Sequence, residues 1–131
     1  MPLRTYLRRI QDLLESLPSI ATYSLSFDER SSQTAFLHGR IYFTDSSVLD
    51  FKEFLLADRE VRKVKYGYHW SAPNGSLRFR YDNAADPAAR HLTSYQHHKH
   101  TPGKIEETEE PTLASVLEEA ANLLAAESLG K

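Results

Sequence analysis

The chain has 131 residues, a formal net charge of −2 and no cysteine. A chain of this length can bury a core as one domain without a disulfide or a metal ion to stabilise it. The lack of cysteine excludes a disulfide framework, and no apolar segment near the N-terminus is long enough for a signal peptide or a membrane span. We therefore expect a single domain over residues 1–131 in the cytoplasm.

The small net charge hides an uneven distribution along the chain. Residues 1–30 contain four basic and four acidic groups, residues 31–105 contain 11 Lys or Arg against seven Asp or Glu, and residues 106–131 contain one Lys against seven Glu. A basic middle part suits a partner that carries phosphate groups. The acidic stretch of residues 106–110 is interpreted as a solvated linker before a helix.

Both ends of the chain have the spacing of amphipathic helices. At the N-terminus, apolar residues spaced by four and three positions predict a helix over residues 2–17, which Pro18 ends. Near the C-terminus, residues 111–129 have a second apolar stripe, and Gly130 suits the end of a helix. The two stripes are formed by Leu3, Leu7, Ile10, Leu14 and Leu17, and by Leu113, Val116, Leu117, Ala120 and Leu124.

Between the helices, apolar and polar residues alternate with a period of two, which is typical of half-buried strands. The pattern predicts five strands, over residues 20–30, 34–43, 48–56, 61–70 and 76–83. Short turns between them favour a mostly antiparallel meander. The predicted fold is therefore α+β, with both terminal helices on one face of the sheet and a histidine-rich segment over residues 84–104.

The dipeptide Asn74-Gly75 is a strong hairpin signal that fixes an expected register between the last two predicted strands. If paired residue numbers sum to 149, one face of the hairpin is aromatic and the other is polar and basic. The aromatic pairs are Trp70 with Phe79 and Tyr68 with Tyr81. The polar pairs are His69 with Arg80, Ser71 with Arg78, and Gly67 with Asp82, continued by Lys65 and Lys63.

Two features stand out as candidates for a site. Four of the six histidines (His91, His97, His98 and His100) lie within ten residues of one another, just after the aromatic strand that contains Arg80 and Asp82. Such side chains titrate near neutral pH or bind anions, although a polar strand end running into a solvated loop is the simpler interpretation. Glu53 is a carboxylate on an otherwise apolar strand face, so it is either at the open end of the sheet or part of a site.

These segments resemble the TumE-type toxins, small bacterial or archaeal proteins that are encoded beside a helix-turn-helix antitoxin. The resemblance covers roughly residues 36–118 and lies in the hairpin around Asp45 and Glu53, in KYGYHW, in FRYDNA and in the final HKH. The sequence departs from the family pattern around Asp86–His91 and at Tyr95-Gln96. The resemblance implies an antitoxin partner, and the matching positions are Glu53, Tyr66, Tyr68, Arg80, Tyr81, Asp82, Asn83, His91, His98 and His100.

Three functions remain open from the sequence. The first is a metal-independent ribonuclease toxin without a cofactor, which needs a base, an acid and fixed positive charge. Its predicted catalytic residues are His98, His100, Glu53 and His91, and its predicted phosphate- or substrate-binding residues are Lys65, His69, Arg78, Arg80, Asp82 and Asn83. The second is a module that binds nucleic acid or a protein partner without catalysis. The third is a metal-dependent hydrolase whose ligands are His98, His100 and Asp82 or Glu53.

Overall fold

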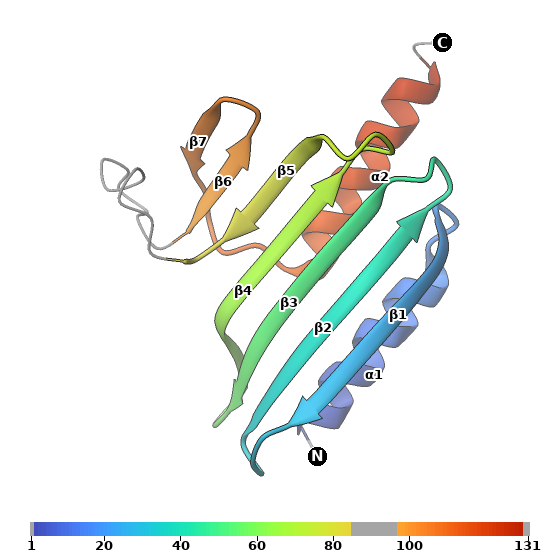
Figure 1. The fold of residues 1–131 in the computed structure, drawn as a ribbon. Helices are drawn as coiled ribbons and strands as arrows, with labels where there is room; N and C mark the ends of the chain where they lie inside the picture. The colour runs from blue at the N-terminus through green and yellow to red at the C-terminus, as the bar shows by residue number, and fades with distance from the viewer. Residues whose placement is uncertain (1, 85–96, 130–131) are drawn as a thin grey trace.

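The structure is a computed structural model that describes residues 2–84 and 97–129. In this part of the chain, seven strands form one antiparallel sheet in which they follow one another in sequence order from β1 to β7 (Figure 1). One helix precedes the strands in the sequence and a second follows them. The helices are α1 (Pro2–Ser16) and α2 (Leu113–Leu129). The strands are β1 (Ile20–Glu29), β2 (Thr34–Phe43), β3 (Val48–Ala57), β4 (Val61–Ser71), β5 (Leu77–Asp82), β6 (His98–Thr101) and β7 (Lys104–Glu107).

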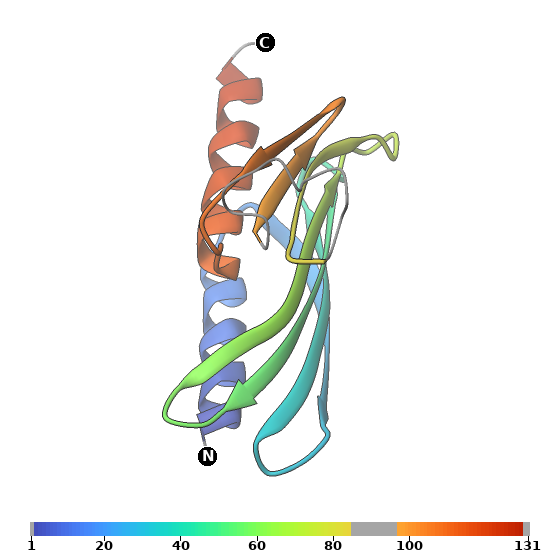
Figure 2. The same ribbon diagram turned by 90° about the vertical axis from the view of Figure 1, so that its left-hand side faces the viewer.

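Both helices lie on the same face of the sheet, which Figure 2 shows edge-on. We call this the helix-covered face, and it carries the buried side chains of the central strands, such as Leu37, Phe51 and Tyr68. The other face carries the alternate residues and has no helix over it in the described part of the chain; we call it the open face. The predicted α+β class and the position of both helices are confirmed.

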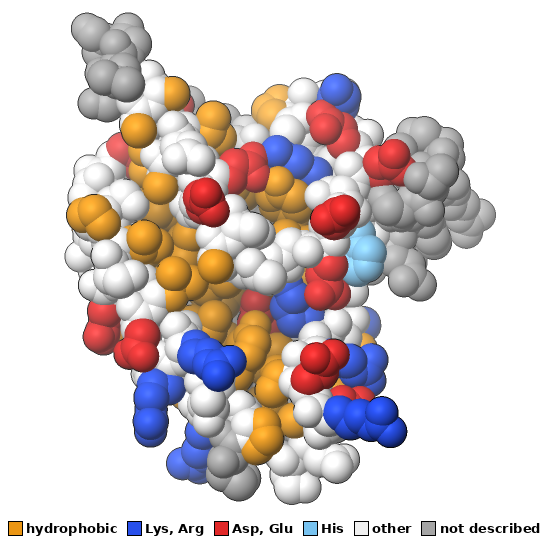
Figure 3. Space-filling model, turned by 180° about the vertical axis from the view of Figure 1, so that it is seen from behind, with side chains coloured by type: hydrophobic (Ala, Val, Ile, Leu, Met, Phe, Trp, Pro, Cys, Tyr) orange, Lys and Arg blue, Asp and Glu red, His pale blue; other side chains and the backbone are white. Residues whose placement is uncertain are grey.

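Aromatic packing on the helix-covered face forms the centre of the core. The ring of Trp70 is fully buried, lies 5.1 Å from the ring of Phe79 between centroids, and donates its Nε1–H to Ser47 Oγ at 3.0 Å. Apolar side chains of both helices complete this core, with α1 contributing Leu3, Ile10 and Leu14 and α2 contributing Leu113, Val116, Leu117 and Ala120. Seen from the helix side, hydrophobic side chains also gather on the surface of this layer (Figure 3).

The prediction of five strands is wrong, because residues 98–107 form a further hairpin of β6 and β7 that pairs with β5. Pro102-Gly103 is its turn, and Gly103 has a φ of 77°, which favours glycine. The two acidic residues Glu106 and Glu107 therefore lie in a strand and not in a linker. Each strand has four residues. β6 (HKHT) alternates histidine with lysine or threonine, and β7 (KIEE) has a single apolar residue, so both lack the apolar pattern that identified the longer strands.

The register predicted for the β4–β5 hairpin is confirmed for four pairs, from Gly67↔Asp82 to Trp70↔Phe79, but not at its end. A register shift makes Ser71 pair with Leu77, so Arg78 turns to the helix-covered face. There its guanidinium lies 4.5 Å from the Trp70 ring and forms ion pairs with Asp45 at 2.9 Å and with Glu127 of α2 at 3.3 Å. The predicted place of Arg78 in the basic row of the open face is therefore wrong.

A second register shift changes the position of Lys63. Phe54 pairs with Lys65 but the next residue, Leu55, pairs with Lys63, so one residue of β4 is left over and the alternation inverts. Lys63 consequently lies on the helix-covered face, where Nζ donates to the Tyr68 hydroxyl at 2.8 Å. Only Lys65 of these two lysines stays on the open face.

Candidate functional site

Antiparallel pairing brings distant parts of the sequence together in rows across the open face. The Asp82 row crosses β2 to β6 and consists of His38, Lys52, Gly67, Asp82 and His98. The Arg80 row is its neighbour on the same face and consists of Arg40, Asp50, His69, Arg80 and His100. Adjacent residues of a row are about 5 Å apart, because that is the spacing of strands in a sheet.

At the β6 end of both rows, two histidines and a carboxylate form a buried cluster. His98 Nδ1 lies 2.7 Å from His100 Nε2, and His98 Nε2 lies 3.3 Å from Asp82 Oδ1 and 2.9 Å from the carbonyl oxygen of Ala84. Asp82 Oδ2 lies 3.8 Å from His100 Nε2. His98 is 0% exposed, whereas His100 keeps 8% and Asp82 9%, so His98 is the innermost member.

The partners of His98 determine where its proton lies. A carbonyl oxygen and a carboxylate oxygen can only accept, so His98 Nε2 carries a hydrogen and donates it. The remaining nitrogen, Nδ1, faces His100 Nε2, and a distance of 2.7 Å requires one proton between these two atoms. The two imidazoles therefore share a proton in one hydrogen bond, with the Asp82 carboxylate 3.3 Å from His98 Nε2 and 3.8 Å from His100 Nε2.

Arg80 links this cluster to the surface of the open face. Its Nε donates to Asp82 Oδ2 at 2.8 Å, while the side chain remains 40% exposed. A guanidinium has five N–H donors, so an ion pair through Nε leaves donors for an anion. The exposed side chain of His69 is the next member of the Arg80 row on β4.

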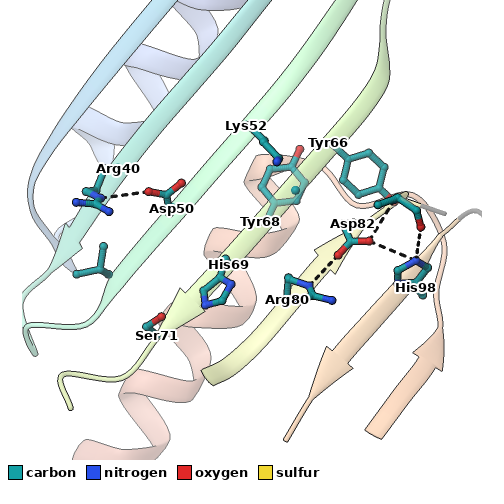
Figure 4. Close-up of a pocket in the computed structure, with 13 residues that line it drawn as sticks. Arg40, Asp50, Lys52, Tyr66, Tyr68, His69, Ser71, Arg80, Asp82 and His98 are labelled. Atoms are coloured by element: carbon teal, nitrogen blue, oxygen red, sulfur yellow. Dashed lines mark hydrogen bonds and ion pairs between the residues drawn. The ribbon is translucent and has the colours of Figure 1, made fainter. Parts of the chain in front are cut away.

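Arg80, Asp82 and His98 line a hollow of about 810 Å³ on the open face, together with Lys52, Gly67 and His69 (Figure 4). Gly67 gives the hollow its depth, because a Cβ atom at this position would lie 3.4 Å from Lys52 Cε and 4.0 Å from Asp82 Cβ. The lining therefore holds three cationic side chains, those of Arg40, Lys52 and Arg80, against the two carboxylates of Asp50 and Asp82, next to the buried histidine cluster. Such a space favours an anionic ligand.

Glu53 lies away from this hollow, on the helix-covered face. Its carboxylate is fully buried and accepts hydrogen bonds from the Tyr6 hydroxyl of α1 at 2.5 Å and from the Tyr68 hydroxyl. Burial and the neighbouring Glu53 charge raise the pKa of both tyrosines. The two hydroxyls thus satisfy the carboxylate and join α1 to the sheet, and the predicted proton exchange of Glu53 with His98 or His100 is wrong because they lie on opposite faces.

The other predicted site residues are divided between the two faces and the turns. The side-chain amide of Asn83 binds the backbone of β4, accepting from Tyr66 N at 3.0 Å and donating at 3.0 Å to the carbonyl oxygen of Val64, which is the residue without a partner in the β3–β4 pairing. Lys65 is exposed on the open face. His97 stacks on Tyr66, and the Tyr66 hydroxyl lies 2.8 Å from its Nδ1. His91 lies outside the described residues.

The same cluster has the donor set for a metal ion. Among the described residues, Asp82, His98 and His100 each offer one ligand atom, and these three atoms lie within 4.8 Å of one another. The bond from His98 Nε2 to the Ala84 carbonyl would fix the tautomer of a metal ligand in the usual way. The set matches the ligands that the sequence predicted for a metal enzyme, so both proton sharing and metal binding agree with the geometry.

Comparison with known proteins identifies the family. A family model described as Toxin TumE matches residues 8–127. The chain belongs to the TumE toxin family. Searches of curated proteins and of solved structures each found no match. Membership in a toxin family implies an antitoxin partner, and no helix in residues 2–84 and 97–129 is long and apolar enough to cross a membrane.

Sequence reasoning missed two parts of this TumE site. The first is the role of the Ala84 carbonyl, which has no signal in a side-chain pattern. The second is the alignment of His69 with His100 on either side of Arg80, which depends on the pairing of β5 with β6. The alternation in His-Lys-His was the available signal for the second, because it predicts that both histidines share one face of an extended segment.

Proposed function

We propose that this TumE-family toxin cleaves RNA without a metal ion, at a phosphate bound over Arg80 between His69 and His100. The observation that carries the proposal is the order of these three residues in one row on the open face. His69 and His100 are two strand spacings apart, about 10 Å between Cα atoms, with the guanidinium between them. A phosphodiester held by Arg80 would then have an imidazole on each side.

This arrangement supplies the groups that the reaction needs. RNA cleavage by its own 2′-hydroxyl requires a base for the hydroxyl proton, an acid for the leaving 5′-oxygen, and positive charge at the phosphate. In the proposal, one of His69 and His100 takes the proton of the 2′-hydroxyl and the other gives a proton to the leaving 5′-oxygen. Arg80 stabilises the charge of the pentavalent phosphorane. The attacking 2′-oxygen forms the new P–O bond as the bond to the 5′-oxygen breaks, which leaves a cyclic phosphate.

His98 and Asp82 act through His100 in this scheme. Both ring nitrogens of His98 are engaged, one by Ala84 and Asp82 and the other by His100. His98 is therefore a positioning residue that holds the His100 ring and shares its proton. Asp82 orients His98 and also fixes Arg80 through the 2.8 Å ion pair.

The test is cleavage of RNA by the purified protein and by single variants. We expect His69→Ala and His100→Ala each to lower the rate about 10²- to 10⁴-fold, the usual loss when a general acid or base is removed. His38→Ala is the matched control and should keep the rate of the unmodified protein. His38 lies on the same face, but its Nε2 lies 3.0 Å from Asp50 Oδ1, in the β2–β3 region. Full cleavage by either of the first two variants would contradict the proposal, and no turnover by the unmodified protein would favour a binding module.

Metal-dependent hydrolysis is a second candidate, because the ligand atoms of Asp82, His98 and His100 converge within 4.8 Å. In that case the three side chains would hold a divalent ion, which supplies a nucleophilic water or polarises the phosphate. The same cleavage assay distinguishes the two candidates when it is repeated with EDTA. Activity that EDTA removes and Zn²⁺ or Mn²⁺ restores would overturn the metal-independent proposal and support this one.

A further inference from the structure

We infer that the toxin acts on single-stranded RNA, whose bases stack on an aromatic and basic platform beside the candidate site. The platform consists of Phe36, Phe54, Lys65 and Lys52 on β2, β3 and β4. The inference rests on the proposed function, since it names the substrate class of that site. It adds a binding surface with its own measurable contribution to affinity.

Three residues of the platform form a third row on the open face, next to the Asp82 row, and Lys52 is the member of the Asp82 row that adjoins them. Phe36 pairs with Phe54, and Phe54 pairs with Lys65. Alternation along β3 places Phe54 two residues from Lys52, on the same face and nearer the β3–β4 turn. Phe36 and Phe54 are partly exposed, and the guanidinium of Arg30 lies 5.9 Å from the centroid of the Phe36 ring.

The position of these aromatic rings requires an explanation other than core packing. The buried aromatic cluster of Phe51, Tyr68 and Trp70 lies on the helix-covered face, whereas Phe36 and Phe54 occupy the alternate positions that face away from it. Two neighbouring aromatic rings at the surface of a sheet provide a place on which bases stack. Cationic side chains beside them would bind the phosphates that connect those bases.

The two lysines of the platform are available for phosphate. Lys52 and Lys65 are exposed, and neither has an ion-pair partner among residues 2–84 and 97–129. By contrast, Arg40 on the same face is paired with Asp50 at 3.1 Å. Positive charge without an ion-pair partner among the described residues, next to partly exposed aromatic rings, favours a polyanion with flat apolar groups, which describes a nucleic acid strand better than a protein segment.

The platform is continuous with the candidate site. Lys52 belongs to the Asp82 row and lines the same hollow as Gly67, Asp82 and His98. Three strand spacings, about 15 Å, separate β3 from β6. A strand of a few nucleotides can therefore stack on Phe36 and Phe54 and pass Lys52 to reach Arg80. The bases of a duplex are stacked on one another and cannot contact such a surface, so the platform selects single strands.

Binding of a labelled RNA oligonucleotide measures the contribution of the platform separately from cleavage. Fluorescence anisotropy would compare one single-stranded RNA with the same RNA in a duplex at fixed salt, in a His100→Ala background in which cleavage is expected to be about 10²- to 10⁴-fold slower. We expect the single strand to bind more tightly than the duplex. We expect Phe36→Leu with Phe54→Leu to raise Kd for the single strand about tenfold or more, because stacking is lost while apolar bulk is kept.

A matched control and a charge variant complete the experiment. Tyr42→Leu alters another aromatic side chain on the open face, 37% exposed and away from the platform, and should leave Kd unchanged. Lys65→Gln should weaken binding and reduce its salt dependence by about one phosphate contact. Melting curves of all variants show whether each is folded.

The outcomes separate the platform from the cleavage mechanism. An unchanged Kd in the folded double Leu variant, or equal affinity for duplex and single strand, would overturn the inference and leave the row as a surface for a protein partner. Cleavage that persists in His69→Ala and His100→Ala, with Kd still dependent on Phe36 and Phe54, would overturn the proposed mechanism and support the platform.

Discussion

At the scale of single residues, Gly39 on β2 and Gly67 on β4, the two strands that flank β3, have different surroundings. A Cβ atom at Gly39 would lie 2.2 Å from Phe51 Cε1 and 2.8 Å from Leu25 Cδ2. The Phe51 ring therefore covers the backbone of β2 directly, as aromatic residues do opposite glycine in sheets. At Gly67 the nearest atom would be Lys52 Cε at 3.4 Å, which is an ordinary contact with a flexible side chain.

This difference gives a matched pair of variants. Gly39→Ala should lower the free energy of unfolding by about 1–3 kcal/mol, because a ring in a packed core has to move. Gly67→Ala should change it little, and should instead narrow the hollow at the candidate site. Urea denaturation of both variants checks the prediction. Equal loss of stability in the two would show that Phe51 does not pack on Gly39 as described.

Glu53 provides the second test at this scale. Because it lies on the helix-covered face and binds Tyr6 and Tyr68, we expect Glu53→Gln to lower the free energy of unfolding by about 1–3 kcal/mol and to leave cleavage by the folded protein unchanged. Thermal melting gives the first quantity and the rate of RNA cleavage gives the second. A large loss of rate in a stably folded variant would return Glu53 to the catalytic residues.

At the scale of elements, alternation along the strands identified five strands and their faces, but it could not locate the bulges. A single extra residue in β4 moves Lys63 to the helix-covered face, and a register shift beside the β4–β5 turn does the same for Arg78. Both side chains then find partners that depend on the helices, namely the Pro111 carbonyl just before α2 and Glu127 within it. Such partners are decided by tertiary packing and leave no trace in the local sequence.

The hairpin of β6 and β7 was missed for a related reason. Apolar residues at alternate positions are the signal for a strand. In β6 the buried alternate positions are instead His98 and His100, whose ring nitrogens are hydrogen-bonded to each other. The histidine cluster itself was predicted as the centre of a site, together with Arg80 and Asp82. The sequence could therefore indicate which residues carry the chemistry, but not that they complete a sheet.

At the scale of the whole molecule, hydroxyl and carboxylate groups join the helices to the sheet. Tyr6 of α1 and Tyr68 of β4 both bind Glu53, and Tyr81 of β5 binds Glu119 of α2. Lys99 of β6 binds the same Glu119 at 2.6 Å, so α2 is connected to two strands through one side chain. These contacts need neutral tyrosines, because a phenolate beside a carboxylate would repel it.

This requirement predicts a loss of stability at alkaline pH. Burial and the hydrogen bond to Glu119 raise the pKa of Tyr81 to about 12, and burial beside Glu53 raises the pKa of Tyr6 and Tyr68 in the same direction. An ordinary tyrosine has a pKa of about 10, so the unfolded chain loses these protons first as the pH rises. The contribution of Tyr81 is therefore fully present below pH 10 and is lost between pH 10 and about 12.

Denaturation at a series of pH values, followed by circular dichroism, measures this loss, and tyrosinate absorbance reports the ionisation itself. Tyr81→Phe is the matched control, because it keeps the ring and removes the titrating group. Its free energy of unfolding should be lower at neutral pH, where the hydrogen bond to Glu119 is missing, and should fall less between pH 10 and 12. If the variant and the unmodified protein lost stability in parallel over this range, the alkaline transition would have to come from other groups, and the hydroxyl contact between β5 and α2 would not be part of what holds this helix on the sheet.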